Sequence, residues 1–291
     1  MDGYTLAIGD RAYSSWSLRG WLAFDAFGVA VALRRARLYS DELPALLADF
    51  APARTVPALR TPEGVVVMDS LAIAEELASR HPRAGHWPEE PRARAVARSL
   101  AAEMHAGFAA LRSHCPMNLR VSYEGCDPPE AVLADLARLE AIWAWARGQT
   151  GATGPWLCGA YSVADAVFAP VASRIATYNL PVGPEAMAYV TAHLAHPSFR
   201  RWRAMGLVDG PDQPFYRRAY PLRAWPGPAP LPAQTVQGTG AENTACPYSG
   251  QAVTHVLELG GRRFGFCNAF CRDKTVADPE AWPAFMALYR S

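Results

Sequence analysis

The sequence predicts an α/β domain, an all-helical domain and a small cysteine-containing module, in that order along 291 residues. Three observations support this division. Strand-like and helix-like stretches alternate over residues 4–80, and only helical patterns follow between residues 92 and 205. Three of the six cysteines then lie within the last fifty residues. A chain of this length can form two or more compact domains.

The first domain is expected over residues 1–82. Thr5–Ile8 is a short apolar run typical of a strand, and an apolar-rich helix from about Ser15 to Phe27 follows it, closed by Gly28. An extended run is expected at 29–38, followed by a loop or short helix that continues through 50. Two strands joined by a tight turn are expected at 55–60 and 65–68, and a final helix at 71–79. This β-α-β-α-β-β-α order is that of a thioredoxin-like fold with a mixed sheet.

The second domain is expected over residues 90–215 and is all-helical. Helical spacing of apolar residues recurs over three long stretches, 92–112, 130–148 and 162–178, and over two shorter ones, 186–194 and 199–205. Ser162 and Asp165 have the Ser-x-x-acid spacing of a capping box, in which the acid side chain accepts from the backbone at the helix start.

Residues 216–243 are expected to be a linker, because five prolines fall between 221 and 232 and few large apolar residues interrupt them. Residues 244–291 regain a pattern. Two alternating runs around Gly260-Gly261 predict a hairpin, a short helix follows from Asn268, and another extends from about 278 to 288. The tail is therefore predicted to be a small ββα(α) module.

The bulk composition excludes two classes of partner. The formal net charge is +1 and 51% of residues are hydrophobic, so there is no electrostatic footprint for nucleic acid or an anionic membrane. No apolar run is long enough to span a bilayer, and Met1–Gly3 does not begin a signal peptide. We therefore expect a cytoplasmic protein, whose cysteines are thiols or metal ligands rather than disulfides.

Three hydroxyls, those of Ser14, Ser15 and Ser17, lie where the first strand leads into the first helix. Free backbone N–H groups and the positive end of the helix dipole favour an anion there. A thiol bound at this point would ionise more easily, because its charged form is the thiolate. The alternative is that one serine only caps the helix.

Two further features belong with these serines. Pro57 precedes a strand, where a cis bond is plausible, and it would leave the backbone of Val56 free to pair with a bound peptide. Asp69 and Ser70 begin a helix that could hold a carboxylate, while Asp69 accepts from an ammonium group. Together the three features describe a groove for a short, zwitterionic, thiol-bearing peptide.

In this order and spacing, the motifs resemble those of bacterial cytosolic glutathione S-transferases over roughly Tyr4–Met205. The Ser14–Arg19 spacing is most similar to the serine-using, zeta-like members. One departure is Trp16, which stands where the zeta pattern has cysteine; it weakens the case for maleylacetoacetate isomerase activity. The resemblance implies that the glutathione-binding residues are Ser14, Ser17, Val56, Pro57, Asp69 and Ser70.

The resemblance also implies a glutathione transferase that forms homodimers. Ser14, with Ser15 as the alternative, would donate to the glutathione thiolate, which would then attack a small electrophile. Arg112, Asn118 and Arg120 are candidates for binding an anionic co-substrate, or else they are polar residues of the surface or between helices. A glutathione-dependent isomerase, a glutathione-binding metal or stress sensor and a purely structural module remain the other hypotheses.

Cys246, Cys267 and Cys271 are candidate metal ligands. Twenty residues separate the first two and three separate the last two, and the predicted hairpin would bring all three thiolates together, as suits zinc or copper(I). The spacing resembles heavy-metal-associated TRASH/YHS-type modules, without a fourth cysteine. His255, Asp273, a water or a partner chain are the candidates for the remaining ligand. The alternative is a small helical appendage with incidental thiols.

Overall fold

The computed structural model describes residues 3–238 and 240–291. The chain divides into two compact units, each built from two stretches of sequence. The first unit contains the residues up to Leu194 together with Gln213–Pro226, and the second contains Ala195–Asp212 together with Gly227–Ser291. None of the helices in the described part of the chain has the length and apolarity needed to cross a bilayer.

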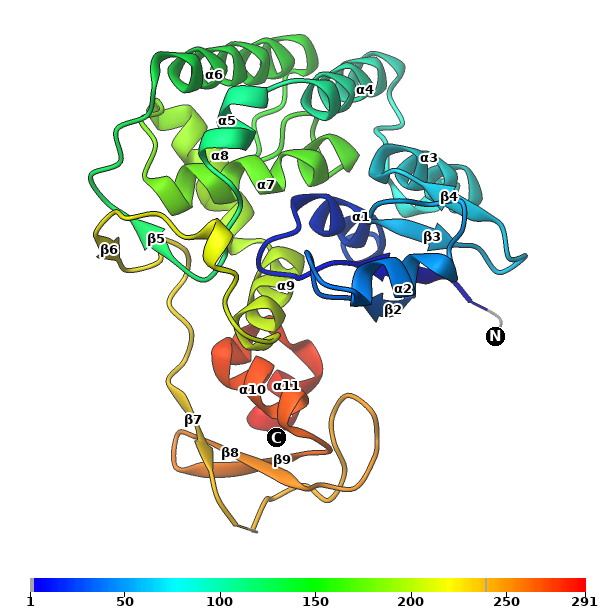
Figure 1. Cartoon of the computed structure of the whole chain (residues 1–291), viewed down its shortest axis with the longest axis vertical. Helices are drawn as coiled ribbons and strands as arrows, with labels where there is room; N and C mark the ends of the chain where they lie inside the picture. Colours follow the sequence, from blue (N-terminus) through cyan, green and yellow to red (C-terminus); the bar gives the residue numbers. More distant parts are fainter. Residues whose placement is uncertain (1–2, 239) are drawn as a thin grey trace. The chain divides into compact units, whose positions relative to one another are not determined.

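A four-stranded mixed sheet begins the first unit, in the spatial order β2-β1-β3-β4. The central strand β1 is parallel to β2 and antiparallel to β3, and β3 forms a hairpin with β4 (Figure 1). The strands are β1 (Thr5–Ile8), β2 (Ala32–Arg35), β3 (Ala58–Arg60) and β4 (Val66–Met68), and the helices are α1 (Ser15–Asp25), α2 (Glu42–Ala48) and α3 (Ser70–Arg80). The predicted thioredoxin-like order of elements is confirmed.

The start of α1 is fixed by packing against the sheet. Leu18, Leu22 and Phe24 of this helix are fully buried. Gly20 faces Pro57, and a Cβ added at Gly20 would lie 2.8 Å from the proline ring. The helix ends two residues before the predicted boundary at Phe27. The close approach of Gly20 and Pro57 sets α1 directly against the segment that enters β3.

Five helices complete most of the first unit, with α7 buried along its whole length at their centre. They are α4 (Pro91–Ala106), α5 (Ala109–His114), α6 (Glu130–Thr150), α7 (Val163–Tyr178) and α8 (Pro184–Ala195). The single helix predicted over 92–112 is wrong, because the chain breaks at Phe108, whose φ is +59°. Asp135 on α6 accepts from the backbone N–H of Leu111 and so holds the separate helix α5.

The carboxyl group of Asp165 organises the start of α7. Its oxygens accept from the backbone N–H groups of Ser162 at 2.9 Å and Leu157 at 3.2 Å, and from the hydroxyl of Tyr189 at 2.9 Å. Burial raises the pKa of Asp165 to about 6, although these hydrogen bonds oppose the rise. The Ser162–Asp165 hydrogen bond agrees with the predicted capping pattern.

The stretch 216–243, expected to be a linker, contains two strands instead. Strand β6 (Leu222–Arg223) pairs with β5 (Ser122–Tyr123) in the first unit, and β7 (Ala233–Val236) pairs with β8 in the second. The proline-rich composition predicts extended backbone. Strand β5, the partner of β6, lies about a hundred residues earlier, so local sequence gives no sign of that pairing.

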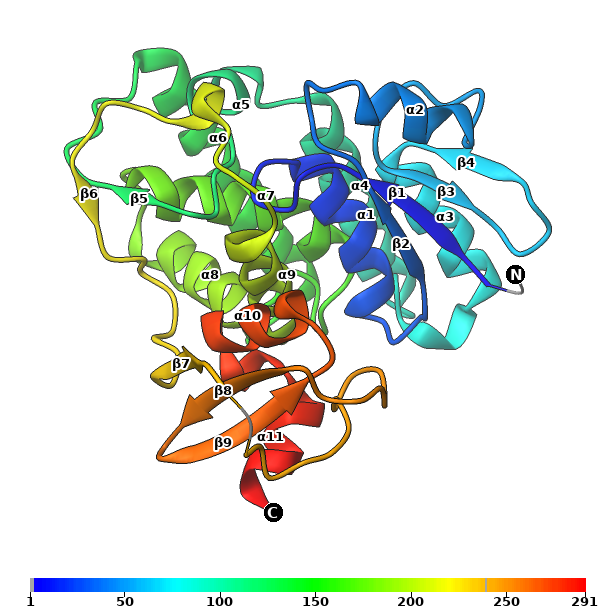
Figure 2. The ribbon, with the colours of Figure 1, turned by 60° about the horizontal axis from the view of Figure 1, so that its bottom comes forward.

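The second unit contains a three-stranded antiparallel sheet in the order β7-β8-β9, side by side in Figure 2. The predicted hairpin is confirmed, and Phe264, Phe266 and Phe285 form the buried core beside it. The helix over Pro197–Val208, expected in the helical domain, belongs to this unit, where Arg200 pairs with Asp278. The elements are α9 (Pro197–Val208), β8 (His255–Leu259), β9 (Arg262–Phe266), α10 (Ala269–Ala277) and α11 (Pro283–Arg290).

Candidate functional site

A cavity of about 750 Å³ opens in the first unit at the start of α1. Side chains from the beginning of α1, from the loop after β2, from the segment before β3, and from α5, α7 and residues 215–218 line its walls. The cavity therefore combines both halves of the first unit. The lining residues used below are Ser14, Ser15, Trp16, Tyr39, Arg54, Val56, Arg112, Arg174, Phe215, Tyr216 and Arg218.

The hydroxyls of Ser14 and Ser17 form hydrogen bonds that hold the start of α1. Ser14 is the N-cap residue, and its hydroxyl accepts from the backbone N–H of Ser17 at 3.3 Å and donates to the Ser17 hydroxyl at 2.7 Å. Ser17 is fully buried and also accepts from the backbone N–H of Gly9. Ser17, expected to bind glutathione, therefore has no exposed surface with which to contact a ligand.

Ser15 is the first residue of α1 and is only half-buried. Its hydroxyl oxygen lies 3.4 Å from a guanidinium nitrogen of Arg174. Two guanidinium groups lie over the ring of neighbouring Trp16, that of Arg19 at 4.6 Å and that of Arg112 at 4.7 Å from the ring centroid. Ser15 is thus the serine of the cluster that combines exposure to the cavity with a cationic neighbour.

Val56 lies in the wall of the same cavity, and its bond to Pro57 is cis, as expected. Among the described residues, no hydrogen bond uses the backbone N–H or C=O of Val56. An unpaired backbone edge of this kind can accept an extended peptide through main-chain hydrogen bonds. The structure therefore leaves free the backbone groups that the sequence assigned to ligand binding.

Asp69 and Ser70 begin α3 but do not line this cavity. The Asp69 side chain caps the helix by accepting from the N–H of Leu71 at 2.7 Å, and its other oxygen lies 3.3 Å from His105. The ring of His105 meets that of Trp16 edge-on, which links Asp69 to the cavity wall. The Ser70 side chain is buried, and its hydroxyl has no hydrogen-bond partner among the described residues.

The three residues expected to bind a co-substrate lie in different surroundings in the structure. Arg112 lines the cavity, and burial lowers the pKa of its guanidinium. Asn118 is buried, where its amide nitrogen donates to the carbonyl of Tyr216 and its oxygen accepts from the N–H of Arg120. Arg120 stacks over Tyr13 outside the set of lining residues. Asn118 and Arg120 therefore hold the wall in place rather than face the cavity.

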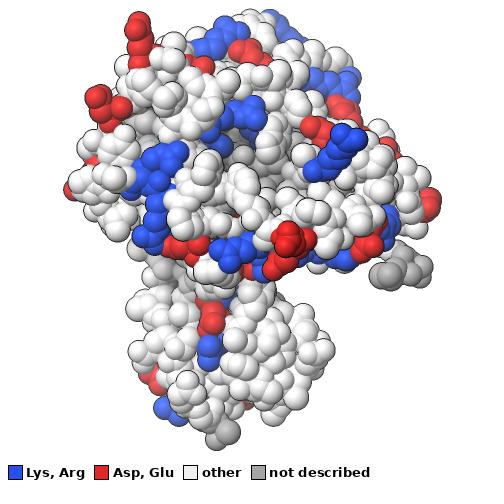
Figure 3. Space-filling view, viewed as in Figure 1, with Lys and Arg blue, Asp and Glu red and all other residues white. Residues whose placement is uncertain are grey.

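Among the described residues, four arginines and no acidic residue line the cavity. They are Arg54, Arg112, Arg174 and Arg218, and basic side chains are visible on this face of the first unit in Figure 3. Burial, with a smaller effect of the nearby Arg112 charge, lowers the pKa of Arg174 to about 10, so this side chain stays charged at neutral pH. The cavity is electrostatically suited to an anionic ligand.

An aromatic rim was not predicted from the sequence. Tyr39 and Phe215 are both largely exposed, with ring centroids 5.7 Å apart, and the hydroxyl of Tyr39 lies 3.3 Å from that of Tyr216. Tyr39 comes from a loop, and Phe215 and Tyr216 come from a proline-rich stretch about 175 residues later. The useful signal would have been the run of aromatic and basic residues at 215–218.

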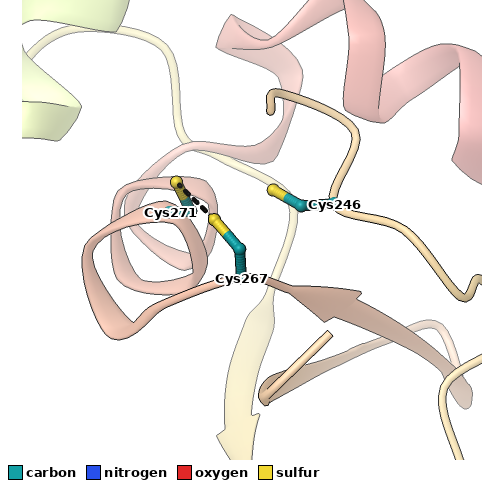
Figure 4. Close-up of side chains that lie close together, drawn as sticks. All are labelled: Cys246, Cys267 and Cys271. Atoms are coloured by element: carbon teal, nitrogen blue, oxygen red, sulfur yellow. Dashed lines mark hydrogen bonds between the residues drawn. The ribbon is translucent and has the colours of Figure 1, made fainter. Parts of the chain in front are cut away.

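The second unit brings together the three cysteines of the tail. The sulfur atoms of Cys246, Cys267 and Cys271 all lie within 4.8 Å of one another, and Figure 4 shows the three side chains close together. All three are free thiols, with Cys267 and Cys271 3.9 Å apart. Cys267 directly follows β9, and Cys271 lies in the first turn of α10, which begins after Asn268 as predicted.

Hydrogen bonds to sulfur surround this cluster. Burial would raise the pKa of Cys246, but backbone N–H groups, those of Cys267, Tyr248 and Ser249, donate to its sulfur and lower that pKa to about 7. The hydroxyl of Ser249 also lies 3.2 Å from the sulfur of Cys267. Three sulfur donors supported by N–H groups fit a thiophilic metal ion.

Neither side chain proposed as a fourth ligand joins the cluster within the described part of the chain. The ring nitrogen Nδ1 of His255 is paired with the hydroxyl of Thr254 at 2.9 Å, and a carboxylate oxygen of Asp273 is paired with Arg272 at 2.7 Å. Over residues 3–238 and 240–291 the structure thus assembles three thiols without a fourth ligand of the His, Cys, Asp or Glu type.

Comparisons with known proteins concern the first unit above all. Residues 13–80 match the family model of the glutathione S-transferase N-terminal domain. Similar solved structures include a glutathione transferase homologue from Burkholderia gl BGR1 with bound glutathione, at 23% identity and a TM-score of 0.53, covering 70% of this chain and 98% of that chain. No curated protein matches the chain significantly.

Two further solved structures have the same fold. Glutathione transferase Omega 2S from Trametes versicolor is 20% identical with a TM-score of 0.56, covering 74% of this chain and 99% of that chain. A glutathione transferase homologue from Sulfitobacter with bound glutathione is 20% identical with a TM-score of 0.52, covering 71% of this chain and 100% of that chain. The chain therefore has the glutathione transferase fold, with a thioredoxin-like N-terminal domain and a helical domain.

Proposed function

We propose that this protein is a glutathione transferase, which activates the thiol of glutathione for attack on a small electrophile. The observation that carries the proposal is one cavity in which the half-exposed hydroxyl of Ser15, at the start of α1, shares a wall with the unpaired backbone of Val56. The match of residues 13–80 to the glutathione S-transferase N-terminal domain supports the choice of peptide.

In this proposal each group has one role. The backbone of Val56 pairs with the cysteinyl part of glutathione, next to Pro57. The γ-glutamyl end extends beyond the cavity to the helix start at Asp69 and Ser70, which the His105–Trp16 contact joins to the cavity wall. Ser15 donates to the thiolate, while Ser14, the other candidate, holds the helix start on which Ser15 sits. A serine hydroxyl is too weak a base to take the thiol proton, so its contribution is electrostatic.

The test is conjugation of a model aryl halide with glutathione by the wild type and two serine variants. We expect Ser15→Ala to reduce kcat/KM by about a hundredfold, because it removes a donor aimed at the developing charge. Ser14→Ala should reduce it less. Calorimetric binding of glutathione separates loss of binding from loss of activation, and a wild type that neither binds nor conjugates glutathione would refute the proposal.

For the second unit we propose a metal site formed by Cys246, Cys267 and Cys271, for zinc or copper(I), as supported by their converging sulfurs. We expect the purified protein to contain about one metal ion per chain, and Cys267→Ser to lose it. Cys126→Ser is the matched control, since Cys126 lies in the first unit. Equal metal content in Cys267→Ser and Cys126→Ser would contradict the site.

The thiol cluster also favours a second candidate function, a glutathione-binding protein that senses or carries metal and has little transferase activity. Tight stoichiometric metal binding without conjugation of any electrophile would select this candidate over the first. A glutathione-dependent isomerase would instead convert its substrate without consuming glutathione. The Ser14–Arg19 motif further supports a zeta-like member of the family. From the family resemblance we propose a homodimer, which sedimentation can test, and from the composition a cytoplasmic location.

A further inference from the structure

We propose that Arg174 is the positioning residue for thiol activation, as the buried positive charge that orients the Ser15 hydroxyl and balances the thiolate. This inference rests on the proposed function. Arg174 lies on α7, 159 residues from Ser15 in sequence, and no motif points to it.

The hydrogen bonds of Arg174 fix its guanidinium at the cavity wall. Nε donates to the carbonyl of Cys115 at 2.8 Å, Nη1 donates to that of Pro170 at 3.1 Å, and Nη2 reaches the hydroxyl oxygen of Ser15 at 3.4 Å. A guanidinium group can only donate, so the Ser15 oxygen is the acceptor. The hydroxyl proton of Ser15 is then left to point elsewhere, and a thiolate in the cavity is a suitable acceptor.

The charge of Arg174 has no carboxylate counter-ion within the described part of the chain. The residue is only 4% exposed, and no carboxylate contacts it among the described residues. Its charged neighbours, Arg19 and Arg112, carry the same sign. A buried charge without a counter-ion raises the free energy of the protein. Binding of an anion beside Ser15 therefore stabilises the buried guanidinium.

The thiolate is the anion best placed to do so. The guanidinium is held next to the hydroxyl at the first turn of α1, where the helix dipole also favours negative charge. Arg54 and Arg218 line the cavity too and can serve carboxylate groups of glutathione or of the electrophile. Arg174 is distinguished from them by its burial and its contact with Ser15.

The experiment measures the pKa of the glutathione thiol in the enzyme complex, from thiolate absorbance during a pH titration. The variants are Arg174→Gln, Arg174→Met and Arg174→Lys, with Arg83→Gln as a control that removes the same charge from an exposed position. We expect the thiol pKa to rise by about one pH unit in the Gln and Met variants, because a like shift is typical of one nearby opposite charge. Lys should restore most of the lowering, and Arg83→Gln should leave the wild-type value.

A second measurement needs only the wild type, in case the Gln and Met variants do not fold. Glutathione sulfonate carries an anion where S-methylglutathione carries an uncharged group. We expect the sulfonate to bind about tenfold more tightly, and equal affinities would overturn the inference. An unchanged thiol pKa in a folded Arg174→Gln complex would do the same. Failure of the wild type to bind glutathione at all would instead reject the proposed function.

Discussion

The hydroxyl of Ser14 donates to the hydroxyl of Ser17 over 2.7 Å, and Ser17 in turn accepts from the backbone N–H of Gly9 over 2.9 Å. This chain of three groups ties the start of α1 to the end of β1. Two of the three serines in the motif are thereby used for structure. Ser14 and Ser15 both line the cavity, but the Ser15 hydroxyl stands outside this chain of hydrogen bonds. The serines should therefore differ in which property depends on them.

Ser14→Ala should lower the free energy of unfolding by about 1 kcal/mol, because it removes the helix cap. Ser15→Ala should change it by less than about 0.5 kcal/mol, since its hydroxyl caps nothing. Urea unfolding followed by circular dichroism measures both values. Equal losses of stability in the two variants would contradict this division of roles.

Gly20→Ala should displace residues that form the cavity wall. The added methyl carbon would lie 2.8 Å from the ring of Pro57, which must shift together with Val56. We expect a loss of about 1–3 kcal/mol in stability, as for other overpacked cores, and weaker glutathione binding. Gly148→Ala, also in a helix but with no atom within 4 Å of the new carbon, is the matched control. Unchanged glutathione affinity in a folded Gly20→Ala protein would count against the groove proposed above.

Asp165 should make stability depend on pH. Its pKa is raised from 3.8 to about 6 in the folded protein, so folding favours the protonated form. This contribution is fully present below the unfolded pKa and is lost as the pH rises through 6. The stability of the wild type relative to Asp165→Asn should therefore fall by about 1 kcal/mol between about pH 5 and about pH 7.5.

The measurement is urea unfolding of both proteins across that range. Other titrating groups are common to the two proteins and cancel in the difference. A difference that stays constant with pH, or that rises, would show that Asp165 is not the titrating group.

Arg200→Met should destabilise the second unit. Arg200 contacts both carboxylate oxygens of Asp278, at 2.6 and 2.8 Å, and little of either side chain is exposed. Removing the arginine leaves a largely buried carboxylate, at a cost of about 2–3 kcal/mol. Arg138→Met is the control, because its pair with Glu103 is exposed and should contribute less than about 1 kcal/mol. The prediction fails if the two variants unfold at the same urea concentration.

The sequence was sufficient for features that local chemistry determines. The hairpins, the capped start of α3 and the Ser162–Asp165 pair follow from residues close together in the chain. The break at Phe108 was missed, because the apolar spacing continues through it and the break depends on a side chain of α6. The pairing of β6 with β5 was missed for the same physical reason, since both partners are set by tertiary contact.

The same distinction, between features set by local sequence and features set by tertiary contact, applies to the candidate site. The backbone of Val56 and the cluster of serines were found from local patterns, as were the three cysteines. The tail cysteines could be grouped because a single hairpin brings them together. Arg174 and Tyr216 were not found, because helix packing and a returning segment place them in the cavity. A basic side chain inside an apolar helix such as α7 is the kind of signal that reveals such residues.

Residues 213–226 return to the first unit between two stretches of the second. Both ends of this segment therefore continue directly into residues of the second unit. The segment carries Tyr216 in the cavity wall and the strand β6. Unfolding the second unit would release both ends together and raise the conformational entropy available to the segment. Deletion of the tail after Pro226 would also remove the partner of α9, so the chain has no single cleavage point that separates its two units.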